Sequence, residues 1–256
     1  MTGRLSIVGL GPGPAHWLTP EAAEALAAAS DLVGYHAYLA RVPPGPPGQR
    51  RYGSDNRQEI ARARHALALA AAGGRVALVS GGDPGVFAMA SAVFEAVEHG
   101  DPAWRRLDIQ VLPGISAMMA AAARVGAPLG HDFCAISLSD NLKPWTLVEE
   151  RLKAAVAGGF VIALYNPVSR ARPWQLGAAF ELLRGLLPGE TPLVLARAVG
   201  RPDEDVTMTT LAAADAGTAD MRTLVLVGST ATRRIDRPDG LPPVLYTPRG
   251  VVVEAT

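Results

Sequence analysis

The stretch RVALVSGGDPGVFAMASAVFEAVEH, residues 75–99, decides the fold class. A run of mostly apolar, β-favouring residues ends at Ser80, a glycine-rich turn follows at residues 81–85, and an alanine-rich amphipathic segment completes the unit. The same order recurs after the apolar runs at residues 5–10 and 108–112. Alternating strands and helices are typical of a parallel sheet covered by helices. The sequence therefore predicts an α/β protein.

The remaining elements and the domain division follow from the same patterns. Further strands are predicted at residues 31–35, 133–138, 160–165, 192–198, 206–210 and 223–227, and helices at residues 20–29, 57–72, 86–99, 146–157, 173–187 and from Ser116 onward. The prolines of residues 43–47 predict a loop, because each removes an amide donor and fixes φ. The proline-rich residues 238–248 are expected to wrap the surface or to order against a partner chain. Residues 126–132 combine glycine and proline without apolar periodicity, which predicts a linker between domains at residues 1–127 and 128–256.

Composition excludes several classes of protein. The 24 basic and 24 acidic side chains cancel, so the chain lacks the positive field typical of proteins that bind nucleic acid or anionic membranes. Cys134 is the only cysteine, which rules out an internal disulfide, and no CxxC or HxxxH spacing indicates a metal site. No apolar run reaches the roughly 18 to 20 residues needed to span a bilayer. We expect a cytoplasmic protein that has no metal and no nucleic-acid or membrane partner.

The first candidate binding motif is Gly9-Leu10-Gly11-Pro12-Gly13-Pro14, directly after the first predicted strand. Glycines let a ligand approach the backbone, although a purely structural turn explains the motif alone equally well. The dinucleotide fingerprint GxGxxG fits poorly, because Pro14 replaces its third glycine and no acidic residue follows residues 31–35. A phosphate-binding loop of the GxxxxGK type is excluded, since the first lysine is Lys143.

Two more glycine-bearing loops follow later strands, at residues 80–87 (SGGDPGVF) and residues 112–117 (LPGISA). A helix-capping turn explains the first by itself, with Asp83 as the cap and Pro84 at the first helical position. In the second, Ser116 is expected to be both a helix cap and a ligand contact. Three such loops at the carboxyl ends of strands in one sheet would line one crevice, where open α/β sheets bind ligands. Packing alone explains this convergence poorly.

In this order the three motifs resemble those of the tetrapyrrole methylases: GxGPG followed by Leu-Thr at residues 9–19, Gly-Asp-Pro at residues 82–84 and Pro-Gly-x-Ser at residues 113–116. The resemblance covers nearly the whole chain. It implies two α/β domains with S-adenosylmethionine in the cleft between them, S-adenosylhomocysteine as the product, and a homodimer. Carried over position by position, it implies cofactor contacts at Leu10, Pro12, Gly81, Gly82, Asp83, Val86, Ser116, Ala117, Leu164, Tyr165, Asn166 and Ala198.

Further segments resemble the branch of this family that methylates C17 of precorrin-3B and contracts the macrocycle to precorrin-4 in cobalamin biosynthesis. They are Gly34-Tyr35 with Tyr38-Leu39, residues 57–60 with Arg62, residues 137–142 with Pro144-Trp145, residues 165–167 with Ser169-Arg170, and residues 197–201. Residues 54–56, Ser-Asp-Asn, depart from the pattern of that branch. The alternatives are another precorrin or uroporphyrinogen methylase, the diphthine synthase branch, against which residues 137–145 argue, and a non-catalytic module that binds a tetrapyrrole or an adenosyl ligand.

The reaction of such a branch needs alignment first and a proton acceptor second. A sulfonium methyl donor is already electrophilic, so loops that align it with the carbon nucleophile suffice for transfer. Ring contraction also requires a group that takes a proton from a hydroxyl while a carbon–carbon bond migrates. His36, Asp140 and Tyr165 stand in the family-like segments and are the predicted catalytic residues. A turn aspartate beside Asn141 explains Asp140 equally well.

Arginines outnumber acids in residues 41–64, which predicts a basic surface suited to a tetrapyrrole with several carboxylates. They are Arg41, Arg50, Arg51, Arg57, Arg62 and Arg64. The alternative is a solvated helix face beside a flexible loop.

Overall fold

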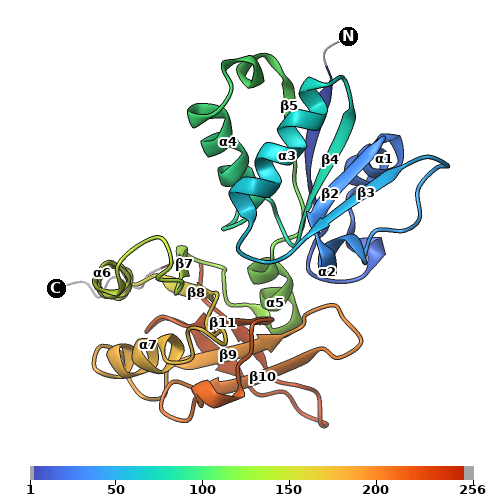
Figure 1. The fold of residues 1–256 in the computed structure, drawn as a ribbon. Helices are drawn as coiled ribbons and strands as arrows, with labels where there is room; N and C mark the ends of the chain where they lie inside the picture. The colour runs from blue at the N-terminus through green and yellow to red at the C-terminus, as the bar shows by residue number, and fades with distance from the viewer. Residues whose placement is uncertain (1–2, 251–256) are drawn as a thin grey trace. The chain divides into compact units, whose positions relative to one another are not determined.

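The computed structural model describes residues 3–250 and divides the chain into two compact units, Met1–Ala117 and Met118–Thr256 (Figure 1). Both are α/β units, so the predicted fold class is confirmed. The predicted division at 127/128 places helix α5 (Ala117–Val125) in the first domain, whereas its contacts link it to the second unit. Met118 donates its amide to the Tyr165 hydroxyl at 3.1 Å, and Arg124 forms an ion pair with Glu204 at 2.8 Å.

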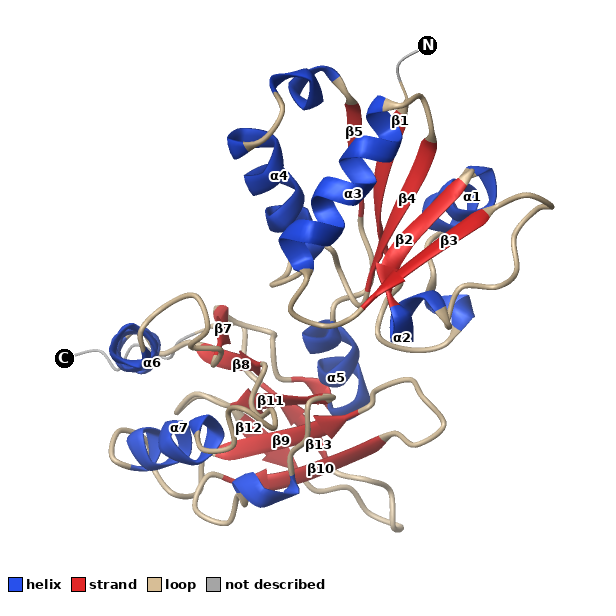
Figure 2. Ribbon diagram, viewed as in Figure 1, coloured by secondary structure: helices blue, strands red, loops and turns tan. Residues whose placement is uncertain are grey.

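The first unit contains a five-stranded sheet in which all neighbouring strands are parallel, in the order β3-β2-β4-β1-β5 (Figure 2). Its strands are β1 (Arg4–Gly9), β2 (Asp31–Tyr35), β3 (Arg50–Ser54), β4 (Arg75–Ser80) and β5 (Asp108–Leu112). Its helices are α1 (Pro20–Ala28), α2 (His36–Leu39), α3 (Glu59–Ala71) and α4 (Met89–His99), with short 3-10 turns at Ala15–Trp17 and Pro102–Arg106.

Two apolar layers bury this sheet on both faces. Successive side chains of a strand point to opposite faces, so Ile7 packs with α3 and α4 while Val8 packs with α1. This explains why β1 and β4 are continuous apolar runs without alternation. Thr19 starts α1 by accepting the amide of Ala22 at 3.2 Å. Because all strands are parallel, the loops after them emerge at one edge of the sheet.

Strand β3 was not predicted, and an ion pair fastens it to β2. Asp31 and Arg50 face each other in the register of the two strands, and the guanidinium Nε lies 2.7 Å from the carboxylate. Ser30 adds a hydrogen bond of 2.6 Å to the same carboxylate. Burial alone raises the pKa of Asp31, but the hydrogen bonds from Arg50 and Ser30 and the charge of Arg50 outweigh it, so the net pKa is lowered.

We expect Asp31→Asn to lower the free energy of unfolding by about 2 kcal/mol at neutral pH, because a charge-assisted pair becomes a neutral one. The folded pKa lies below the ordinary value of 3.8, so this stabilisation is present above that value. It is lost as the pH falls through the folded pKa. Urea unfolding of both proteins at neutral and acidic pH measures the difference, which should shrink in acid. Equal stability at pH 7 would contradict the assignment.

The second unit contains a mixed sheet rather than a purely parallel one, in the order β10-β9-β11-β8-β7. Its strands are β7 (Phe133–Ser137), β8 (Val161–Tyr165), β9 (Pro192–Arg197), β10 (Asp205–Thr210) and β11 (Thr223–Val227). Helices α6 (Trp145–Ala157) and α7 (Gln175–Arg184) contribute to its buried core, and a 3-10 turn lies at Ala216–Thr218. Strand β11 is antiparallel to both β8 and β9, so β7, β8 and β9 run in the same direction.

A small three-stranded sheet joins two segments that the sequence analysis treated as irregular. Its strands are β6 (Gly126–Ala127), β12 (Arg233–Ile235) and β13 (Val244–Tyr246), in the order β12-β13-β6. The proline-rich tail therefore orders against its own chain, where the Thr247 hydroxyl also donates to the carbonyl of Pro128 at 2.6 Å. The segment expected to be a linker begins as a strand of this sheet.

Candidate functional site

Three loops meet at the carboxyl edge of the first sheet, after β1, β4 and β5. The loop after β1 continues alongside β4, since the Leu10 amide donates to the carbonyl of Ser80 at 2.9 Å. Gly11 and Gly82 then exchange two hydrogen bonds of 3.1 Å each. Their φ angles of +64° and +66° are in the left-handed region, which favours glycine. The first two predicted motifs thus form one structure.

Asp83 joins the third loop to the second. One carboxylate oxygen accepts the amide of Gly85 at 2.8 Å and the other accepts the amide of Gly114 at 3.1 Å. A Cβ on Gly114 would lie 2.4 Å from the carbonyl oxygen of Gly82 and 3.0 Å from backbone atoms of Gly9. The backbones of the three loops are therefore in direct contact. The Asp83 carboxylate links the second loop to the third, and the bonds between Gly11 and Gly82 link the first to the second.

Gly82 and Gly11 are packed less closely than Gly114, although Gly11 itself is buried and Gly82 half-buried. A Cβ on Gly82 would meet no atom closer than 4.0 Å, and one on Gly11 none closer than 3.6 Å. Leu10 is 6% exposed, so only its backbone can contact a bound molecule. The other predicted cofactor contacts of this unit lie on the same three loops, buried or half-buried: Pro12, Gly81, Val86, Ser116 and Ala117.

Asp83→Ala is expected to weaken binding of a ligand at these loops by about tenfold, because two backbone amides lose a charged acceptor. Titration calorimetry with S-adenosylmethionine, which the sequence resemblance implies as the ligand, measures the change. Thermal unfolding should show that the variant is still folded. A folded variant with unchanged affinity would mean that the loops do not form the ligand site.

His36 lies at the same edge, at the start of α2 directly after β2. Its side chain is exposed, and the imidazole lies against the backbone of Gly53, where a Cβ would be 2.2 Å from Nδ1. Tyr35 and Tyr38 form an edge-to-face pair with ring centroids 5.4 Å apart, and the Tyr38 ring covers Gly81. Two of the branch-like segments thus contact each other beside the glycine loops.

Most of the arginines expected to form a basic surface are engaged within the chain. Arg41 donates from Nη2 to the carbonyls of Gly11 at 2.8 Å and Gly13 at 3.0 Å, which fixes the first glycine loop. Arg51 donates to the carbonyls of Leu39, Val42 and Pro43. Arg62 is buried and donates to Ser54 and Asp55, and Arg50 pairs with Asp31. Arg62 is therefore excluded from a basic surface by its burial, Arg41 is half-buried, and Arg50, Arg51, Arg57 and Arg64 are exposed.

The predicted residues of the second unit gather at the carboxyl edge of its own sheet. Ser137 pairs with Tyr165, and the register across β11 places the ends of β8 and β9 level with each other on either side of β11. Asn166 and Ala198 directly follow those two strands with φ angles of 52° and 50°. Non-glycine residues in this region are strained and concentrate at functional sites. Leu164 is fully buried, so it presents no exposed surface at this edge.

Asp140 belongs to a polar cluster after β7, of which only Asp140 itself was a predicted site residue. Both of its carboxylate oxygens lie 3.1 Å from Nε2 of Gln175, a residue only 1% exposed, and Arg172 Nε lies at 4.0 Å. Lys143 donates to the carbonyl of Ser137 at 2.8 Å. Burial, and the charges of Arg151 and Arg172, lower the pKa of Lys143, while Asp140 raises it.

Sequence reasoning missed Lys143, Arg172 and Gln175 as members of this cluster. Lys143 stands within the family-like segment 137–145, so that segment was a usable signal. Gln175 carried no signal, since nothing in its sequence surroundings indicates a buried polar partner. Tyr165, the third predicted catalytic residue, accepts the amide of Met118 through its hydroxyl.

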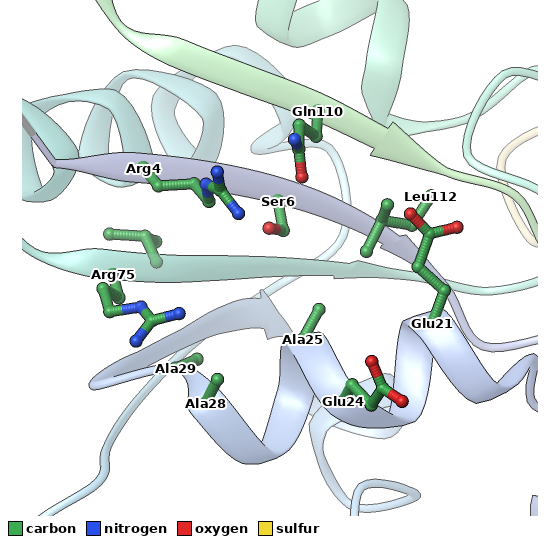
Figure 3. A pocket seen from close by; sticks show the side chains of 11 residues that line it. Arg4, Ser6, Glu21, Glu24, Ala25, Ala28, Ala29, Arg75, Gln110 and Leu112 are labelled. Atoms are coloured by element: carbon green, nitrogen blue, oxygen red, sulfur yellow. The ribbon is translucent and has the colours of Figure 1, made fainter.

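A cavity of about 390 Å³ lies elsewhere, between α1 and the face of the first sheet (Figure 3). Arg4, Ser6, Glu24 and Gln110 are among its lining residues, and none of the predicted site residues is. Within residues 3–250, no group of three or more His, Cys, Asp or Glu side chains could hold a metal ion. No helix in that range is long and apolar enough to cross a membrane.

Comparison with known proteins defines the class. Residues 4–215 match the family of Tetrapyrrole (Corrin/Porphyrin) Methylases, and the chain belongs to this family, as the motifs predicted. It is 58% identical over 249 residues to the precorrin-3B C(17)-methyltransferase of Sinorhizobium sp, covering 97% of each chain.

Two solved structures extend the comparison. The crystal structure of the methyltransferase CobJ is 50% identical with a TM-score of 0.91, covering 96% of this chain and 100% of that one. The uroporphyrin-III C-methyl transferase of Thermus thermophilus, solved with S-adenyl homocysteine, is 25% identical with a TM-score of 0.64 over 88% of this chain and 97% of that one.

Proposed function

We propose that this chain is an S-adenosylmethionine-dependent methyltransferase that methylates C17 of precorrin-3B and contracts the macrocycle to precorrin-4 in cobalamin biosynthesis, working as a homodimer. The observation that carries the proposal is the 58% identity, over 97% of both chains, to a relative that bears the name of this activity. The segments that resemble the precorrin-3B branch also support the proposal. They include the residues that directly follow β2, β7 and β8, at the strand ends where α/β sheets bind ligands.

The glycine loops fit the cofactor. Gly82 is half-buried and a Cβ on it would meet no atom closer than 4.0 Å, so its backbone leaves room for a ligand, and Asn166 forms an exposed left-handed turn in the second unit. When bound, the cofactor supplies a methyl group already activated by the positive sulfonium. The residues proposed to hold it are Leu10, Pro12, Gly81, Gly82, Asp83, Val86, Ser116, Ala117, Leu164, Tyr165, Asn166 and Ala198.

The protein contributes to methyl transfer mainly by alignment. Fixing the reacting groups in line can remove roughly 7 to 11 kcal/mol from a barrier, more than an acid or base usually supplies. Alignment requires loops that are held in fixed positions. In the first unit, Arg41 fixes the loop after β1 through the carbonyls of Gly11 and Gly13. Asp83 connects the loops after β4 and β5 by accepting the amides of Gly85 and Gly114.

For ring contraction we propose Asp140 as the group that accepts the proton, with Tyr165 and His36 as the alternatives. The hydroxyl O–H bond breaks and its electron pair forms a carbonyl, while the neighbouring carbon–carbon bond migrates to the adjacent ring carbon, from which a leaving group departs with its bonding electron pair. The Asp140 side chain is 25% exposed, so a substrate can reach it, while Gln175 fixes its orientation. A carboxylate held in this way is a suitable acceptor.

The test is incubation with precorrin-3B and methyl-labelled S-adenosylmethionine. Mass spectrometry should show one added methyl group, and the absorption spectrum should report contraction. Label that enters uroporphyrinogen or another precorrin, but not precorrin-3B, would support a different regiochemistry. Binding of both compounds without movement of label would indicate a non-catalytic module. Light scattering tests the homodimer.

A further inference from the structure

The polar cluster in the second unit has more hydrogen-bond donors than the protein uses. Three buried polar atoms there have no hydrogen-bond partner, although Arg172 Nε lies 4.0 Å from Asp140: Ser169 Oγ, Arg172 Nε and Gln175 Oε1. A buried polar group left unpaired costs about 1 to 3 kcal/mol, so such atoms indicate water or a ligand. Gln175 Oε1 is an acceptor and suits a water molecule, whereas Arg172 Nε is a donor and the Ser169 hydroxyl can donate.

Hydrogen bonds place the residues that carry these donors near one another. Ser169 and Arg172 exchange backbone hydrogen bonds of 3.0 and 2.9 Å, so their side chains lie on the same face of this turn. The Arg172 Nη1 reaches the carbonyl of Leu138 at 3.5 Å, and the Lys143 ammonium reaches that of its neighbour Ser137 at 2.8 Å. Two cations therefore donate to consecutive residues, the last residue of β7 and the one that follows it.

The positive charges in the cluster favour binding of an anion. Lys143 and Arg172 both interact with the carboxylate of Asp140, and Arg151 adds a further positive charge near Lys143. The lowered pKa of Lys143 has this excess of positive charge as one cause, after burial. A second carboxylate bound here would receive charge-assisted hydrogen bonds from donors that are otherwise unused.

We propose that Lys143, Ser169 and Arg172 form a receptor for one peripheral carboxylate of the tetrapyrrole substrate. The identification of the ligand as a tetrapyrrole rests on the proposed function. The two loops that carry the receptor also expose apolar surface, Leu142 at 97% and Trp174 at 48%, which suits the flat apolar body of a macrocycle. Trp174 packs edge-to-face on Trp145 at 4.9 Å, which joins these loops.

The first test measures tetrapyrrole binding in the presence of S-adenosylhomocysteine, which prevents turnover. Lys143→Gln and Arg172→Gln should each weaken binding of precorrin-3B by about ten- to a hundredfold, as loss of a charged hydrogen bond predicts. Arg172→Lys should weaken tetrapyrrole binding less than Arg172→Gln does, because lysine keeps the positive charge but not the planar set of guanidinium donors. Affinity for S-adenosylhomocysteine should not change. Lys153→Gln is the matched control, since Lys153 is exposed and is the only other lysine.

The second test needs no variant. Amine acetylation followed by peptide mass spectrometry compares Lys143 with Lys153, and a bound tetrapyrrole should protect Lys143 alone. Unchanged affinity in the folded variants, or equal labelling of Lys143 with and without tetrapyrrole, would overturn the receptor and leave water as the partner of these atoms. Protection by another polycarboxylate tetrapyrrole, together with no methylation of precorrin-3B, would sustain the receptor and reject the proposed regiochemistry.

Discussion

Gly114→Ala should lower the affinity for S-adenosylmethionine by about a hundredfold, since a displaced backbone can cost 1 to 3 kcal/mol. The added Cβ would lie 2.4 Å from the carbonyl oxygen of Gly82 and 3.0 Å from Gly9. All of these neighbours are backbone atoms, so no side chain can rotate away. The loops after β1, β4 and β5 would have to separate, and titration calorimetry on the folded variant measures the consequence.

Two other glycine-to-alanine substitutions serve as controls for the steric clash at Gly114. At Gly82 the space is open, but φ is +66°, so alanine should cost only the roughly 1 to 2 kcal/mol of a left-handed residue. At Gly177, inside α7, a Cβ meets nothing within 4 Å, and alanine should stabilise the helix by about 1 kcal/mol. Cofactor affinity that falls no further in Gly114→Ala than in Gly177→Ala would disprove the close approach of the loops as the basis of the site.

The core elements were predictable because burial on both faces leaves long apolar runs. Strands β1, β4, β8 and β11 are such runs, and their positions agree with the prediction. Strand β3 was not predicted, because it is an edge strand with the polar sequence RRYGS and no buried residue. Strands β6 and β13 are too short to show any period. Strand direction is also invisible to periodicity, so the antiparallel β11 was read as part of a parallel sheet.

The site was predictable where its function depends on glycine and proline, and not where it depends on distant polar partners. The three glycine loops were placed at one edge because parallel strands force that arrangement. Arg41 was assigned to a basic surface, because its real partners are backbone carbonyls that no side-chain pattern reveals. Gln175 lies 35 residues from Asp140, and only the fold brings the two together.

Asp140→Asn should reduce ring contraction by on the order of a hundredfold or more while methyl transfer falls little. The amide keeps the size of the carboxylate and one oxygen that can accept from Gln175 Nε2, but it removes the basicity. Transfer depends on alignment, to which this carboxylate does not contribute. The variant should therefore accumulate a methylated, uncontracted macrocycle, with product mass reporting the methyl group and absorbance reporting the ring.

The controls for Asp140→Asn distinguish proton transfer from substrate binding and from folding. Lys143→Gln should weaken tetrapyrrole binding and so slow both steps together at low substrate, with the ratio of contracted to uncontracted product unchanged. Asp132→Asn makes the same chemical change on a side chain that is 76% exposed, and should alter neither step. Equal loss of both steps in Asp140→Asn would assign Asp140 a structural role through Gln175 and Arg172. No loss of either step would leave Tyr165 and His36 as the proton acceptors to test, because contraction requires one such group whichever residue provides it.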